Sequence, residues 1–64
     1  MKSKHNLITL SNMIFITNSL HYAIKDHDST RWRIFVDDTC RDSADNAGIA
    51  LAKIQDILEG MINE

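Results

Sequence analysis

The clearest pattern in the chain is an apolar stripe that repeats every three or four positions over its last third. Between residues 47 and 62 this stripe consists of Ala47, Ala50, Leu51, Ile54, Ile57, Leu58, Met61 and Ile62. The spacing keeps one side of an α-helix apolar, while charged residues such as Lys53 and Asp56 fall on the other sides. The pattern predicts a helix over residues 47–62, which must bury its stripe against another surface.

A second apolar pattern lies near the start, between about Asn6 and Asp26. Its main stripe has spacings of three and four and consists of Leu7, Leu10, Ile14, Thr17, His21 and Ile24. A further line, at a spacing of seven, runs through Ile8, Phe15 and Tyr22. These spacings predict a first long helix, although the β-branched content of residues 13–17 also fits a strand. The polar residues 25–30 predict a reversal, with the N-cap of a second helix at residue 28, 29 or 30.

Residues 31–36, RWRIFV, fit a strand as well as a helix, because Trp32, Ile34 and Val36 alternate with the other three residues. A strand would need a partner, either an extended first segment or an identical strand across a dimer. A helix is favoured by an unbroken series of four and three spacings through Val36, Cys40, Ser43, Ala47, Ala50, Ile54, Ile57 and Met61. We therefore expect an all-α helical hairpin, whose second helix is either continuous or broken near residues 40–43.

The unequal lengths of the two expected helices predict self-association. A first helix of about 21 residues spans roughly 31 Å, and a continuous second helix from Thr30 to Asn63 spans roughly 50 Å. The far end of the second helix would stay uncovered, and an antiparallel partner covers it most simply. We therefore expect a homodimeric helical bundle. The expected dimer or partner interface consists of Ala47, Ala50, Leu51, Ile54, Ile57, Leu58, Met61 and Ile62.

The composition is consistent with one small domain that gains from association. A chain of 64 residues buries only about 60% of its unfolded surface, so its own core is marginal. The single cysteine, Cys40, excludes an internal disulfide and is typical of a reducing cytoplasm. The absence of proline and the presence of only two glycines are typical of long helices rather than of strands and turns. We expect residues 1–5 to be disordered.

Charge and polarity exclude several classes of protein. The net charge of -2 disfavours general binding to a polyanion. The apolar run between residues 7 and 24 is interrupted by seven polar residues, so it does not predict a membrane span. The same interruptions, at Ser11 and Asn12, disfavour a secretory signal. We expect no association with a membrane.

The sequence contains no motif for catalysis or for binding a metal ion. His5, His21, His27 and Cys40 lack the spacing of metal ligands, and no second motif accompanies them. We interpret Cys40 as a small core residue. We expect no cofactor, no metal ion and no enzymatic activity.

One local cluster, Arg31, Trp32 and Arg33, combines basic and aromatic side chains. Arginine contacts phosphate and tryptophan can stack on a base, so the cluster is a candidate nucleic-acid contact. The same residue types are common at the energetic centres of protein interfaces. The expected function is protein–protein interaction, and the alternative is a nucleic-acid-binding regulator that uses this cluster.

Residues 16–38, ITNSLHYAIKDHDSTRWRIFVDD, resemble the short accessory proteins encoded between the exonuclease and excisionase genes of lambdoid phages. The resemblance implies a small, helical, non-enzymatic protein made early in phage development. Such a protein modulates its host or the choice between lysis and lysogeny, in the cytoplasm of a bacterial host. The resemblance carries over no functional residue.

Overall fold

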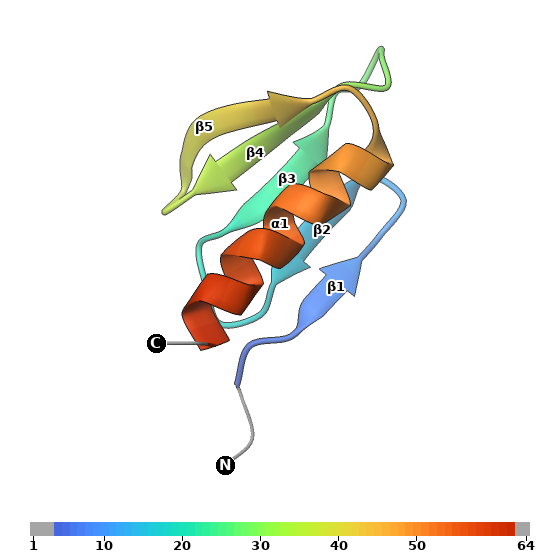
Figure 1. Ribbon diagram of the computed structural model, residues 1–64. Helices are drawn as coiled ribbons and strands as arrows, with labels where there is room; N and C mark the ends of the chain where they lie inside the picture. The colour runs from blue at the N-terminus through green and yellow to red at the C-terminus, as the bar shows by residue number, and fades with distance from the viewer. Residues whose placement is uncertain (1–3, 63–64) are drawn as a thin grey trace.

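The computed structural model describes residues 4–62, which form five β-strands followed by one α-helix (Figure 1). The elements are β1 (Leu7–Thr9), β2 (Met13–Ile16), β3 (Tyr22–Lys25), β4 (Trp32–Val36), β5 (Thr39–Ala44) and α1 (Ala47–Ile62). The strands form one antiparallel sheet in the order of the sequence, so each strand pairs with its neighbours along the chain. Helix α1 packs across one face of this sheet, against strands β2 to β5.

The expected all-α helical hairpin is therefore wrong, and the helical bundle built from it is wrong with it. Residues 7–44 form the sheet, and strand β5 occupies residues 40–43, where the second helix was expected to continue or break. Residues 31–36, which fitted both a strand and a helix, contain β4, and its partner strands come from the same chain. The strand alternative for residues 13–17 corresponds to β2.

Two parts of the sequence-based prediction are confirmed. The predicted helix over residues 47–62 is α1, with the same bounds. The predicted reversal at residues 25–30 corresponds to the loop between β3 and β4, which spans residues 26–31. That reversal joins two strands, however, and no helix begins at residues 28–30.

The turns of this sheet are made without glycine or proline. Among the described residues, three that are not glycine have positive φ angles, namely 57° at Asn18, 54° at Asp37 and 63° at Asp38. Asp37 and Asp38 connect β4 to β5, and positive φ at both central positions is what a type I′ hairpin turn requires. Asparagine and aspartate tolerate this conformation because their short polar side chains bond locally. The scarcity of glycine and the absence of proline therefore do not indicate long helices in this chain.

The start of the chain is bonded to the loop between β2 and β3. Residues 1–3 of the segment expected to be disordered lie outside the described residues. The carbonyl oxygen of Lys4 accepts hydrogen bonds from Thr17 Oγ1 at 3.2 Å and from Asn18 Nδ2 at 3.0 Å. His5 Nδ1 lies 3.0 Å from the carbonyl oxygen of Thr17. Residues 4 and 5 are thus held beside this loop.

The hydrophobic core lies between the sheet and α1. Successive side chains of a strand point to opposite faces, so every second residue of β2, β3 and β4 faces the helix. The buried residues are Ile14, Ile16, Ala23, Trp32, Ile34, Ala44, Ala50 and Ile54. Partly buried residues pack around them, namely Leu7, Leu51, Ile57, Leu58 and Met61. The apolar stripe of α1 is therefore covered by the chain's own sheet.

Polar contacts fix α1 at its first turn and at the neighbouring edge strand. The side-chain oxygen of Asn46 accepts a hydrogen bond from the backbone N–H of Ile49 at 2.9 Å, which makes Asn46 the N-cap. Lys53 Nζ donates to Asp42 Oδ2 at 2.8 Å and to the carbonyl oxygen of Ser43 at 2.9 Å. The hydrogen bond from Lys53 Nζ, and next the hydrogen bond from the backbone N–H of Ser43, hold the pKa of the Asp42 carboxyl below its ordinary value of 3.8.

A β-bulge gives β5 its register against β4. Asp42 pairs with Ile34, whereas Cys40 pairs with Phe35, so Arg41 is the extra residue. Ile34 lies on the helix side of the sheet, and its cross-strand neighbour Asp42 therefore lies on that side too, within reach of Lys53. Cys40 comes to lie on the opposite side.

Truncation of Ile54 tests the packing of α1 on the sheet. Ile54 is fully buried, so Ile54→Ala should lower the free energy of unfolding by about 2–5 kcal/mol through lost contacts and a residual cavity. The change is measured by urea unfolding followed by circular dichroism. Asp56→Ala is the control on the exposed side of the same helix and should change the free energy by less than about 0.5 kcal/mol. Equal effects would contradict this packing.

A substitution at Asp37 tests the hairpin turn. A β-branched side chain is strained at a φ of 54°, so Asp37→Val should be less stable than Asp37→Asn by about 1–2 kcal/mol. Both variants remove the same charge, so the loss of charge does not contribute to their difference. Thermal unfolding of the two variants measures it, and indistinguishable midpoints would argue against a left-handed residue at this position.

Candidate functional site

The face of the sheet that points away from α1 is the open face, because no helix of residues 4–62 covers it (Figure 1). The pleat directs to this face the side chains that alternate with the buried ones. The strand register groups them in two rows that cross the sheet. The aromatic row consists of Ile8, Phe15, Tyr22, Phe35 and Cys40. The second row consists of Met13, Ile24, Arg33 and Ser43.

The centre of the open face is apolar and partly accessible to solvent. Ile24, in the central strand β3, exposes 41% of its surface, and Phe15, Tyr22 and Phe35 are half-buried. Ile8, in the edge strand β1, exposes 36%. The rings of Tyr22 and Phe35 stack, with their centroids 4.8 Å apart and their planes 13° apart. An exposed apolar surface that extends over several strands is typical of an interaction surface.

A carboxylate bounds the open face at the end where the β4–β5 turn lies. The hydroxyl of Tyr22 donates a hydrogen bond to Asp38 Oδ1. The backbone N–H of Asp38 donates to the carbonyl oxygen of Leu20 at 2.9 Å, which ties this turn to the loop between β2 and β3. The hydrogen bond to Asp38, together with desolvation and the negative charge, raises the pKa of Tyr22 above its ordinary value of 10.0.

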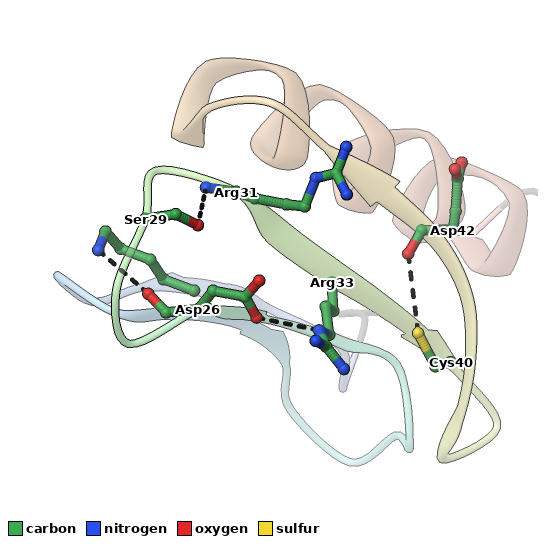
Figure 2. A network of polar contacts seen from close by, with 7 residues as sticks. Asp26, Ser29, Arg31, Arg33, Cys40 and Asp42 are labelled. Atoms are coloured by element: carbon green, nitrogen blue, oxygen red, sulfur yellow. Dashed lines mark hydrogen bonds and ion pairs between the residues drawn. The ribbon is translucent and has the colours of Figure 1, made fainter.

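An ion pair bounds the open face at the opposite end. Arg33 Nε donates to Asp26 Oδ1 at 2.9 Å, and the Arg33 side chain remains 61% exposed. In Figure 2, where α1 lies above the sheet, Asp26 and Arg33 meet on the side away from the helix. The open face thus combines an apolar centre with one exposed cation and two carboxylates at its ends.

The cluster of Arg31, Trp32 and Arg33 that the sequence suggested is divided by the pleat. Trp32 is 3% exposed and belongs to the core beneath α1. Arg33 extends from the opposite face, and Arg31 is exposed in the segment before β4, where its N–H donates to Ser29 Oγ at 3.1 Å. The structure therefore does not bring these three side chains together, and Trp32 cannot stack on a base while the chain is folded.

The residues expected to form a dimer or partner interface on the helix are distributed over several environments. Ala50 and Ile54 are buried in the core, so no partner can reach them in the folded chain. Leu51, Ile57, Leu58 and Met61 are half-buried against that core, whereas Ala47 and Ile62 are exposed. The argument from unequal helix lengths no longer applies, because the first helix does not exist. A contact through the more exposed members of this stripe stays an untested prediction.

Cys40 lies in an exposed position of β5, so its interpretation as a core residue is wrong. Its thiol lies 3.9 Å from the carbonyl oxygen of Asp42 (Figure 2). Within residues 4–62, no group of three or more histidine, cysteine, aspartate or glutamate side chains is arranged to hold a metal ion. The helix in this part of the chain is too short and too polar to cross a bilayer.

The sequence pattern assigns the aromatic residues of the open face to the wrong kind of element. Ile8, Phe15 and Tyr22 are seven positions apart, which is also a helical spacing. In the structure they are cross-strand neighbours in two successive hairpins. The strict alternation in residues 32–36 does indicate a strand, and it places Arg33 and Phe35 on the face opposite Trp32 and Ile34.

No protein-family model, no curated protein and no solved structure matches this chain. What the open face can bind is therefore inferred from its own chemistry. Its centre offers apolar and aromatic side chains to a partner, and its ends offer charges of both signs.

The titration of Tyr22 tests the geometry at the turn end of the open face. Tyr22 is the single tyrosine of the chain, so the absorbance of the phenolate reports it alone. Its midpoint should lie above pH 10.0 and should move back toward that value in Asp38→Asn, whereas Asp37→Asn, the matched control, should leave it unchanged.

The hydrogen bond between Tyr22 and Asp38 also makes the stability of the folded chain depend on pH in the alkaline range. Because folding raises the pKa of Tyr22, its contribution to stability is complete below pH 10.0 and is lost as the pH rises through the folded value. Asp38→Asn should weaken this alkaline loss, measured as the change of the unfolding midpoint with pH. An unshifted Tyr22 midpoint in the unsubstituted chain would contradict the contact.

Proposed function

We propose that this chain is a small, non-enzymatic protein that acts by binding another protein through the open face of its sheet. The observation that supports the proposal is the apolar centre of this face, where Ile24 is 41% exposed beside the aromatic row. Protein interfaces commonly have an apolar and aromatic centre surrounded by polar groups. Arg33, Asp26 and Asp38 supply such groups at the ends of the strands.

The proposed setting is the cytoplasm of a bacterial host, where the interaction modulates the host or the development of a phage. This part of the proposal is supported by the resemblance of residues 16–38 to the short accessory proteins of lambdoid phages. This stretch of residues 16–38 includes four residues of the open face, Tyr22, Ile24, Arg33 and Phe35. The helical fold that the resemblance implied is not retained.

A nucleic-acid partner fits the same surface less well. The rings of Tyr22 and Phe35 stack on each other, so each offers at most one face to a base. Carboxylates accompany both polar groups of the face, Asp26 beside Arg33 and Asp38 beside Tyr22, and these would repel a phosphate backbone. The net charge of -2 adds to this repulsion. We therefore favour a protein partner.

Photo-crosslinking from the open face tests the proposal. Phe15 is replaced by benzoylphenylalanine in bacterial cells that produce the full chain, and Ile49, which is exposed on α1, is replaced in the control. Illumination should yield one discrete protein adduct from position 15 and much less of it from position 49. Adducts with nucleic acid alone, or equal yields from both positions, would refute the proposal.

A further inference from the structure

The open face presents a surface that can pack against itself. We infer that a second copy of this chain covers it, with the two open faces in contact about a two-fold axis that runs perpendicular to the strands. The inference rests on the proposed function, because it names the partner of the same surface. It differs from the helix-mediated dimer expected from the sequence, since α1 lies on the outside of the pair.

The side chains of the open face and the small core of the domain both favour a second copy as the partner. A two-fold contact uses the same patch on both partners, so the patch must contain groups that complement one another. The open face contains apolar side chains at its centre, an exposed cation at one end and a carboxylate at the other. A domain of this length also has little core of its own, and a second sheet stacked about 10 Å away would bury a second apolar layer.

The charge of Arg33 selects the direction of the axis. With the axis perpendicular to the strands, each strand lies over its own counterpart and runs in the opposite sense. When this axis lies midway between the two rows, the aromatic row of one copy lies over the second row of the other. Phe35 of one copy then faces the partner's Arg33, whose guanidinium can stack on the Phe35 ring. The same guanidinium can approach Asp38 in the β4–β5 turn of the copy that supplies Phe35.

An axis parallel to the strands gives a poorer fit. Strand β4 would then lie over the partner's β2, and Arg33 would meet the partner's Met13. The guanidinium would lose water and gain no new carboxylate beyond its own Asp26, which is unfavourable for a charged group. Charge complementarity therefore favours the perpendicular axis.

The edges of the sheet are less suited to self-association than its face. Strand β5 is an edge strand, but the bulge at Arg41 interrupts its regular backbone and its central residues are charged. Strand β1, at the other edge, has three residues. Bulges, charges and short lengths are the usual means by which edge strands avoid pairing with other chains.

The area of the open face predicts a weak dimer. The sheet has five strands of 3 to 6 residues, and at about 3.3 Å per residue and about 4.8 Å between strands its flat area is about 350 Å². Two copies would bury about 700 Å² of this flat area in total, at the low end for specific contacts. Interfaces of about 1,600 Å² have dissociation constants from the μM to the pM range, so this smaller contact should form at chain concentrations of about 1 to 100 μM.

Analytical ultracentrifugation of the purified full chain over this concentration range tests the inference. Ile24→Asp on the open face should weaken self-association at least tenfold, because it introduces a charge at the centre of the contact. Ile49→Asp is the matched control, since Ile49 exposes 42% of its surface on α1 and Ile24 exposes 41% on β3. Circular dichroism confirms that both variants fold. A monomeric wild type, or equal loss in both variants, would overturn the inference.

The thiol of Cys40 tests the direction of the axis. With the perpendicular axis the two Cys40 residues lie about 12 Å apart, and with the parallel axis they lie about 22 Å apart on opposite edges. A short bismaleimide should therefore join two wild-type chains efficiently, and Ile24→Asp should abolish the product at the same concentration. Dimers in the ultracentrifuge that the reagent does not join would overturn the proposed arrangement.

These results separate the inference from the proposed function. If the purified chain is monomeric and position 15 nevertheless crosslinks to one different protein in cells, the second copy is excluded and the proposed function stands. If position 15 yields no protein adduct and the chain is monomeric, both are excluded. An adduct with twice the mass of the chain supports the second copy as the occupant of the open face.

Discussion

One helix can cover only one face of a sheet, and this constraint explains most of the molecule. Helix α1 has 16 residues and packs on strands β2 to β5, where it buries a compact set of isoleucine, alanine and tryptophan side chains. The alternating residues of the same strands are largely apolar as well, and within residues 4–62 they receive no cover of this kind. One apolar layer is therefore buried between the sheet and α1, and a second apolar layer, on the open face, is accessible to solvent.

The helix was predictable because all the information that specifies it is local. The stripe over residues 47–62 recurs at helical spacing, and the covering surface affects only what the stripe contacts. The reversal at residues 25–30 was predictable for the same reason, because its polar residues compete with regular backbone hydrogen bonds wherever they occur. Neither feature depends on which strands pair with which.

The sheet was not predictable from the same reasoning, and two physical causes explain this. Its turns use Asn18, Asp37 and Asp38 in the left-handed conformation, so the usual glycine and proline signals are missing. Both faces of β2 carry apolar residues, so the alternation of buried and exposed positions that identifies a strand is hidden. The first two hairpins place Ile8, Phe15 and Tyr22 seven residues apart, a spacing that is also typical of helical heptads. Strand pairing is a non-local property that such spacings do not encode.

The candidate site shows the same division between local and non-local information. Residues Arg31, Trp32 and Arg33 are adjacent in sequence, which suggests one cluster, but the pleat of β4 directs Trp32 into the core and Arg33 to the open face. The actual surface is assembled from strands β1 to β5, and Tyr22 and Phe35 stack although 12 residues lie between them. Only the register of the sheet could have revealed that contact.

The accessibility of the isoleucine methyl groups is the most direct measure of whether the open face is the binding surface. In methyl NMR spectra with a soluble paramagnetic agent, a dilute sample should show protected methyl groups at Ile14, Ile34 and Ile54 and strongly broadened ones at Ile8 and Ile24. At high concentration the methyl groups of Ile8 and Ile24 should become protected, while those of Ile49 and Ile62 on α1 stay broadened. Protection that develops on α1 instead, with the open face still accessible, would contradict the structure-based account of how this chain binds.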